Sequence, residues 1–327
     1  MNRWLTPSLV AALLAVSIVS LLAGTVWLRP DELWHGLIDT QPNLAGLVLA
    51  EVRVPRLILA ILIGAILGLS GAVLQGLLRN PLAEPALLGV SGGASLGAVI
   101  AIYFGFSASF ALASPIFALT GAMITAAIAF SLARGGGTLS LILAGAAVSS
   151  VAFAFVQLAL NLAPNPFAAY EIVNWLMGSL QDRSWDHVEL AAPFIMVGAI
   201  LLLMTRRALD ALALGEAQAE SLGVHVGRTR MLALIGTAVG VGAATAVAGA
   251  IGFVGLIAPH VVRPLVGYRP AGTLIPAALA GAILVVVGDV CTRLIRFGPP
   301  IGLGVFISVV GAPFFLWLVL HVRRRTA

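Results

Sequence analysis

Long uncharged, apolar stretches alternate with short polar breaks along the whole chain. A transmembrane helix needs roughly 20 apolar residues at about 1.5 Å each, and eight runs approach or exceed that length. Pro85–Ala133 and Met231–Val262 are too long for one helix each. The pattern predicts an all-α integral membrane protein with nine or ten crossings. The eight runs are Trp4–Leu28, Leu57–Leu78, Pro85–Ala133, Gly135–Tyr170, Leu190–Thr205, Met231–Val262, Ala271–Gly288 and Phe297–His321.

Arginine placement decides between the two counts. Positive residues concentrate on the cytoplasmic side of membrane proteins, and both Met1–Arg3 and the terminal "HVRRRTA" are basic. We therefore expect both termini to be cytoplasmic, which requires an even number of crossings. With ten crossings, most of the 18 arginines face inward. The segment "GFVGLIAPHVVRP" then becomes a short, broken piece inside the bundle.

Composition supports a bilayer as the solvent of a single domain over residues 1–327. Hydrophobic residues make up 60% of the chain and charged residues 9%, whereas a soluble domain carries roughly a quarter charged residues. The sequence contains no lysine, so the net charge of +5 comes from arginine. In so apolar a chain this charge orients loops rather than binding nucleic acid. The apolar run after Arg3 is too long for a signal-peptide core, so we expect a retained helix.

A weak internal repeat accompanies the breaks. Aligning Gly71-Ala72 with Gly249-Ala250 also aligns Pro81 with Pro259. Repeats that contain broken helices are typical of transporters, and the break often marks the working site. The first break reads "RNPLAEP", and backbone freed by its prolines is tolerable only where it lines water or contacts protein. It is either a functional element or an ordinary turn.

The stretch "EVRVPRLILAILIGAILGLSGAVLQGLLRNPLAEPALLGVSGGASLG" resembles the permease subunit of the cobalamin, haem and iron-siderophore (FecCD-type) class of ABC transporters. Similar stretches follow in order: "LILAG", "NWLMGSL", "LALGEAQAESLGV", "AVAGAIGFVGLIAPHVVR", "LAGAILVVVGDVCTR" and "PIG…GAPFFLWL". They span nearly the whole chain. The resemblance implies a ten-helix subunit that pairs with a second permease subunit, identical or paralogous, around a central pathway. It also implies a cytoplasmic ATPase pair and an extracytoplasmic binding protein.

The resemblance assigns the first break to a cytoplasmic gate. Asn80 offers a polar side chain at the inner mouth and Leu82 an apolar plug, and both match gate residues of such permeases. A second gate element of the family is a Thr-Ser pair at the start of the fifth helix. Here Thr138 matches but Leu139 follows it, so the pair is half present.

The segment "LALGEAQAESLGV", within a polar loop at about 206–230, is similar to the family's coupling loop that docks the ATPase. The residues themselves predict two short helices, with glycine stops and an acidic residue favouring the second helix start. Its mixed charge argues against the alternative, a basic anchor on the lipid surface. The predicted coupling residues are Leu212, Leu214, Gly215, Glu216, Ala217, Leu222 and Gly223.

Three arginines on the predicted outer side run against the topological trend. In the family, arginines matching Arg53, Arg56 and Arg293 pair with glutamates of the docked binding protein. The alternative is local pairing, such as Arg53 with Glu51 or Arg293 with Asp289. The chain also departs from the family by reading "RFGPPIG", where an acidic residue usually precedes "PIG".

Catalysis and metal binding by this chain are not expected. "GVSGG" lies in an apolar helical run without a nucleophile elbow's surroundings, and "RGGGT" lacks the lysine of a phosphate-binding loop. The five histidines have no paired ligand spacing. No cofactor is expected on the chain itself, with ATP and Mg²⁺ on the partner ATPase.

The predicted function is a non-catalytic permease subunit in the bacterial inner membrane, moving a bulky metal chelate. Iron-siderophore is the first choice of substrate, with cobalamin and haem as alternatives. The alternative from another class is a proton-coupled secondary transporter, in which Asp289 would be the coupling group.

Overall fold

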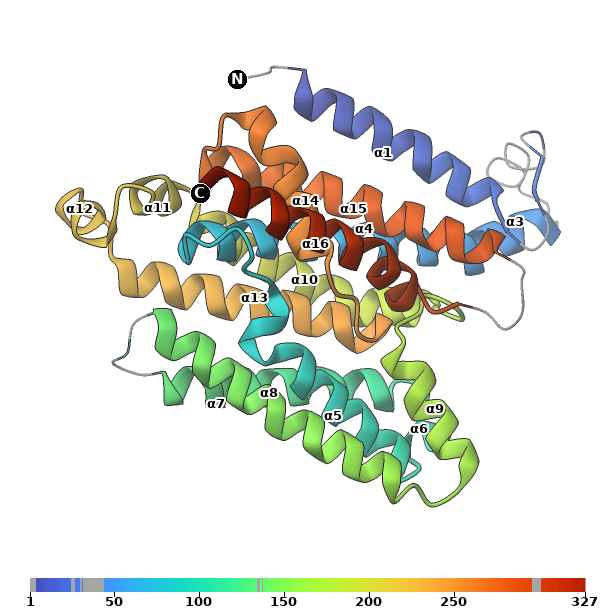
Figure 1. Cartoon of the computed structure of the whole chain (residues 1–327). Coiled ribbons are helices and arrows are strands. Elements are labelled where there is room, and N and C mark those ends of the chain that lie inside the picture. The colour runs from blue at the N-terminus through green and yellow to red at the C-terminus, as the bar shows by residue number, and fades with distance from the viewer. Residues whose placement is uncertain are drawn as a thin grey trace.

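The computed structural model describes residues 4–24, 27–29, 31, 44–133, 136, 138–295 and 301–326, excluding the side chains of Leu87, Thr138, Leu139 and 318–326. Throughout these residues the regular elements are helices, packed side by side in a bundle (Figure 1). Seven are long and apolar enough to cross a membrane. They are α1 (Leu5–Leu22), α4 (Val54–Leu77, continued backwards by η1, Leu49–Arg53, and α3, Leu44–Val48), α7 (Ala113–Leu132), α8 (Thr138–Asn161), α10 (Trp185–Met204), α13 (Val226–Ala248) and α15 (Pro270–Leu294).

Three shorter apolar helices complete the set. They are α5 (Val90–Tyr103), α14 (Val254–Val262, continued by η3, Arg263–Val266) and α16 (Leu303–Thr326). The prediction of an all-α membrane protein with about ten spans, some short or broken, is thus confirmed. Residues 252–264, expected as a broken piece inside the bundle, contain all of α14 and the first two residues of η3. The internal repeat stays a prediction.

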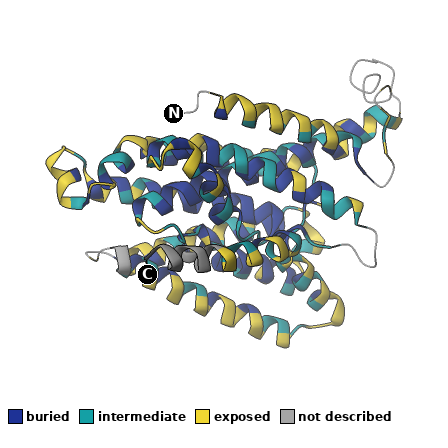
Figure 2. Cartoon of the chain, turned by 45° about the horizontal axis from the view of Figure 1, so that its top comes forward, coloured by how far each residue is buried: buried dark blue, intermediate teal, exposed yellow. Residues whose placement is uncertain are grey.

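The core of the bundle is built on α4 and α13. Figure 2 shows buried residues concentrated in the central helices and exposed residues on the outermost ones. We compared the share of buried residues in the most apolar part of each helix. It is 78% for the helix that contains α4 and 83% for α13, but only 11% for α1. Most side chains of α1 are apolar and few are buried, as expected for a helix whose neighbours are lipid chains. Helix α1 therefore lies at the periphery of the bundle (Figure 1).

Glycines let the central helices approach closely. A Cβ on Gly64 of α4 would lie 2.3 Å from the carbonyl oxygen of Gly281 in α15, and one on Gly71 would collide with Gly255 in α14. Small residues at crossings are the usual means by which membrane helices pack, because lipid supplies little hydrophobic drive between them. The same device joins α5 to α7 at Gly93.

Short helices mark the two ends of the bundle. Helices α11 (Arg206–Leu212) and α12 (Glu216–Ser221) project beyond one end, where α1 begins and α16 ends (Figure 1). The short helix α9 (Pro166–Leu176) lies at the opposite end. This arrangement fits an even number of crossings, and the cytoplasmic placement of both termini remains a prediction.

Candidate functional site

The first break, between α4 and η2 (Pro85–Leu88), is a tight turn held by its own residues. The Oδ1 atom of Asn80 accepts a hydrogen bond from the backbone N–H of Leu82 at 2.9 Å, and Arg79 has a positive φ of 47°. Asn80 is exposed and Leu82 half-buried, at the end of α4. Asn80 therefore fixes the position of Leu82, and the assignment of both residues to a gate stays a prediction.

Glu84 ties this break to the second one. One of its carboxylate oxygens accepts a hydrogen bond from the backbone N–H of Phe253, which precedes α14 and has a φ of 64°. Burial raises the pKa of Glu84 above its usual value, while the hydrogen bond from Phe253 acts in the opposite direction. This link was not predicted from the sequence, although an acidic residue between Pro81 and Pro85 in an apolar region indicates that a hydrogen-bond partner is needed.

The predicted coupling segment forms two short helices, as expected. Gly215 precedes α12 with a φ of 117°, and Gly223 follows α12 with a φ of 82°, conformations that favour glycine. Leu214 and Leu222 are each 65% exposed. Ala217 is also exposed, on the first turn of α12. The structure corrects one residue: Leu212 is 2% exposed and packs in the core, so it cannot offer a docking surface.

Two ion pairs fix α11 and α12 against the bundle. Glu216, the first residue of α12, pairs with Arg230 of α13 at 2.5 Å. Asp210 of α11 pairs with Arg269 at 2.9 Å and also accepts the N–H of Ala271 at the start of α15. Exposed ion pairs stabilise little by themselves, but here they join the projecting helices to two spans. The ion pairs therefore connect α12 to α13, and α11 to the start of α15.

At the opposite end, two arginines contact one buried carboxylate, and a third arginine lines the same cavity. Asp289, 1% exposed, receives hydrogen bonds from Arg56 at 2.8 and 2.9 Å and pairs with Arg293 at 3.0 Å. The local pair Arg293–Asp289, left open by the sequence, is therefore present. Arg53 is 8% exposed and donates to the carbonyls of Leu21 and Leu22 at the end of α1.

The arginines at this end also line a cavity of about 590 Å³. Arg293 donates to the carbonyls of Ser20 and Ala23, so two guanidinium groups satisfy the last carbonyls of α1. Among the described residues that line the cavity, three arginines and one aspartate leave it with excess positive charge. Docking of acidic side chains at Arg53, Arg56 and Arg293 stays a prediction.

Helix α8 carries a polar stripe on an exposed face. Ser150, Gln157 and Asn161 are spaced seven and four residues apart, which places them on one side of a helix, and all three are exposed. An amide such as that of Gln157 is unfavourable against hydrocarbon, so this face needs protein or water as its neighbour. The stripe was not predicted from the sequence, although the spacing of seven and four residues between its polar members places them on one helix face. Thr138 begins α8, and its side chain lies outside the described residues.

No cofactor site emerges from the described part of the chain. Within it, no group of three or more histidine, cysteine, aspartate or glutamate side chains is arranged to hold a metal ion. The prominent features of the described residues are two helix breaks, a projecting helix pair and a basic cavity at the opposite end.

Comparison with known proteins yields consistent matches over nearly the whole chain. Residues 12–321 match the model of the FecCD transport family. The vitamin B12 import system permease protein BtuC of Citrobacter koseri is 37% identical, over 98% of this chain and 95% of that protein. The hemin transport system permease protein HmuU of Yersinia pestis is 34% identical, over 99% of both chains. The Fe(3+)-citrate import system permease protein YfmE of Bacillus subtilis is 36% identical, over 97% of this chain and 95% of that protein.

A solved structure gives the same result. A metal-chelate type ABC transporter in an inward-facing conformation superposes with a TM-score of 0.84 and 30% identity, over 98% of this chain and 99% of that one. Both the family model and relatives above 30% identity cover far more than half of the chain. The chain therefore belongs to the FecCD transport family.

Proposed function

We propose that the chain is the membrane-spanning permease subunit of a binding-protein-dependent ABC importer, located in the bacterial inner membrane. The observation that carries the proposal is the α11–α12 pair. It projects from the bundle, presents the exposed Leu214 and Leu222, and is joined by ion pairs to α13 and α15. Such a pair suits docking on a partner that changes shape, because its motion reaches two spans directly.

The partner ATPase would supply the energy, with ATP and Mg²⁺ bound there and not by this chain. Closure of an ATPase pair would push α11 and α12, and the movement would alternate an inner gate at Asn80, Leu82 and Thr138 with an outer one. A binding protein would deliver substrate at the end that carries Arg53, Arg56 and Arg293.

A second permease subunit, identical or paralogous, would complete the pathway. The stripe of Ser150, Gln157 and Asn161 supports this, because an exposed polar face on a spanning helix calls for water or another subunit. A pathway between two subunits would satisfy both requirements along the length of α8.

The substrate class is a bulky metal chelate. Relatives named for vitamin B12, hemin and Fe(3+)-citrate import favour this class without choosing within it. An iron-siderophore is our first choice, and cobalamin and haem are the alternatives.

The competing function, proton-coupled secondary transport, required Asp289 as a proton carrier. Arg56 and Arg293 both contact that carboxylate, and it is buried. Both carboxylate oxygens are occupied by these two guanidinium groups, which leaves Asp289 no open site facing a pathway. Asp289 is better explained as a structural partner.

The deciding experiment is uptake by the chain reconstituted with its ATPase and binding protein. Labelled iron-siderophore, cobalamin and haem would be offered in turn, with ATP or with a proton gradient alone. The proposal expects uptake of one chelate that requires ATP and the binding protein. Uptake driven by the gradient without ATP would refute it.

A further inference from the structure

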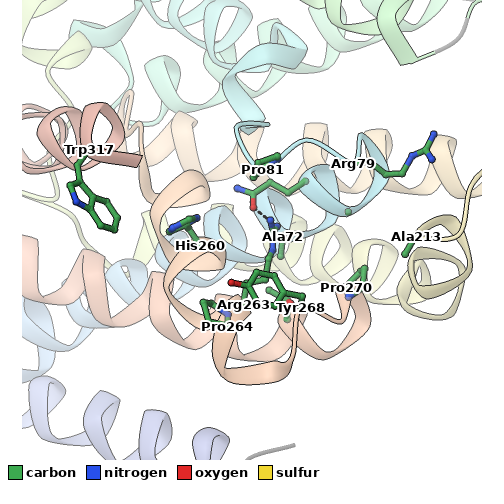
Figure 3. Close-up of a pocket in the computed structure, with 13 residues that line it drawn as sticks. Ala72, Arg79, Pro81, Ala213, His260, Arg263, Pro264, Tyr268, Pro270 and Trp317 are labelled. Carbon is green, nitrogen blue, oxygen red and sulfur yellow. Dashed lines mark hydrogen bonds between the residues drawn. The ribbon is translucent and has the colours of Figure 1, made fainter. Parts of the chain in front are cut away.

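A cavity of about 590 Å³ lies beside the projecting helix pair, between the end of α4, α14, η3, the start of α15, and α16. Figure 3 labels four of its residues that carry the argument: Arg79, Arg263, Tyr268 and Trp317. Gln75 also lines the cavity. Its volume falls in the usual range for small-ligand sites, about 300 to 1,000 Å³. Neither the predicted gate nor the coupling segment explains its chemistry.

Arg263 is held in place by a buried side chain. Gln75 is 2% exposed, donates to the carbonyl of Gly255, and accepts a hydrogen bond from Nη2 of Arg263. A guanidinium has five N–H donors. Within the described part of the chain, the other donors of Arg263 make no hydrogen bond or ion pair. The cavity thus contains a positioned cation with donors left to offer.

Charge in the cavity is one-sided. Arg79 and Arg263 both line it, and no aspartate or glutamate does among the described residues. Asp210, on the neighbouring α11, is already occupied by Arg269 and by the N–H of Ala271. An arginine without a carboxylate partner favours an oxyanion such as phosphate, which its planar fork binds in a bidentate manner.

The surroundings indicate an amphipathic ligand. The cavity lies where α4 ends and α15 begins, which is the level of lipid headgroups for helices that span a bilayer. Tyr268 and Trp317 are 62% and 53% exposed at its rim, the residue types of a membrane interface. Val261 at the end of α14 and Leu265 in η3 are also exposed, and they flank Arg263 in the chain.

We propose that this cavity binds the phosphate group of an anionic phospholipid. The phosphate oxygens would accept hydrogen bonds from Arg263, with Arg79 adding positive charge at the rim. The acyl chains would lie along Val261 and Leu265. This assignment does not depend on which substrate the chain transports, because it rests on residues at the ends of α4, η3 and α16 and the start of α15.

The test uses the full-length chain, delipidated in a neutral detergent and titrated with brominated phosphatidylglycerol or brominated phosphatidylcholine. Bromine quenches nearby tryptophan, and subtracting the signal of Trp317→Phe isolates Trp317. Both lipids carry a phosphate, but the choline cation of phosphatidylcholine cancels its charge and is repelled by Arg79 and Arg263. We therefore expect phosphatidylglycerol to quench Trp317 at about tenfold lower concentration than phosphatidylcholine, a difference of about 1.4 kcal/mol. Equal quenching by the two lipids would overturn the proposal.

Two variant pairs assign the preference to the cavity. Arg263→Met removes the donors and should abolish the preference for phosphatidylglycerol, whereas Arg263→Lys should keep part of it. Ala213→Glu places a competing carboxylate at the exposed edge of the cavity, and Ala217→Glu places one on α12 outside it. Loss with Ala213→Glu and retention with Ala217→Glu support the site, even if Arg263→Met does not fold. Retained preference in folded Arg263→Met or in Ala213→Glu refutes it.

Soluble competitors distinguish the possible sources of the phosphate. Inorganic phosphate and glycerol 1-phosphate, added at the same concentrations as phosphatidylglycerol, should displace little of the brominated lipid, because neither carries acyl chains. Displacement as effective as that by unlabelled phosphatidylglycerol would show a free-anion site and overturn the lipid assignment. Displacement by a metal chelate would assign the cavity to the transport pathway instead.

Discussion

Glu84 and Phe253 lie 169 positions apart, yet the Glu84 carboxylate accepts the backbone N–H of Phe253 at 2.5 Å. The contact joins the two helix breaks, and Phe253 in turn packs where Gly311 leaves room on α16. A single hydrogen bond thus connects the predicted gate turn with α14 and α16. Its loss should affect both breaks together.

We expect Glu84→Ala to destabilise the chain by about 1–3 kcal/mol, the cost of leaving a buried N–H without an acceptor. Glu84→Gln keeps an acceptor oxygen and should cost less. Thermal unfolding in detergent micelles measures both. Glu189→Ala, on an exposed position of α10, is the control and should change little. Equal stability of Glu84→Ala and wild type would show that the contact does not hold the breaks.

The same residue predicts a pH dependence. The pKa of Glu84 is raised above its ordinary 4.5 in the folded state by burial. The folded chain therefore binds protons more strongly than the unfolded one, and the contribution of Glu84 to stability falls as pH rises from about 4.5 towards the raised pKa. Subtracting the melting curve of Glu84→Gln from that of wild type at each pH isolates this contribution. Parallel pH profiles of the two proteins would contradict the prediction.

Coupling should depend on Leu214 and Leu222. Replacing both by Asp puts charges on the exposed docking surface and should abolish co-purification of the ATPase and ATP-driven uptake. Thermal stability should stay unchanged, because neither residue packs in the core. Glu216→Arg is a less specific test, since it also removes the ion pair with Arg230. Leu132→Asp, an exposed position at the end of α7, is the matched control. Normal uptake by the double variant would exclude α11–α12 from coupling.

The features of the fold that depend on local composition, the spans and the helix stops, could be predicted from sequence patterns. Apolar run length and arginine placement predicted ten spans, and the glycines at 215 and 223 predicted the stops of the coupling helices, because a positive φ leaves few alternatives. Contacts between distant segments could not be read in this way. The burial of Leu212 and the hydrogen bond from Phe253 to Glu84 depend on how helices far apart in the chain pack.

The outer arginines illustrate the same limit. Their charge and position suggested a docking surface or local pairs. Only the packing of α1 against η1 and α15 shows that Arg53 and Arg293 reach backbone carbonyls of α1. Backbone acceptors leave no trace in a sequence, since every residue has one.

The gate prediction can be tested at Leu82 by cross-linking. Cysteines at Leu82, in a Cys291→Ser background, should form a disulfide between two permease subunits when the inner gate is closed. Formation requires the two Cα atoms within about 7 Å. Nucleotide or binding protein should change the yield. A cysteine at Leu162, at the other end of α8, is the control. No cross-link in any state of an intact dimer would leave residues 79–85 as a plain turn.

Arg293 has two separable roles: it holds the end of α1 through the carbonyls of Ser20 and Ala23, which we call the clamp on α1, and it is predicted to dock the binding protein. Arg293→Gln removes one partner of the buried Asp289 and frees two carbonyls of α1, so we expect a loss of about 3 kcal/mol in stability without any binding protein. If the cluster also docks acidic side chains, the variant should bind the binding protein more weakly, with a flatter salt dependence. Arg29→Gln removes the same charge from an exposed pair with Asp31 and should change stability little.

Unfolding curves measure the role of Arg293 in stability, and binding isotherms at two salt concentrations measure its role in docking. Unchanged stability in Arg293→Gln would contradict the clamp, and unchanged affinity in a folded variant would contradict a role of Arg293 in docking.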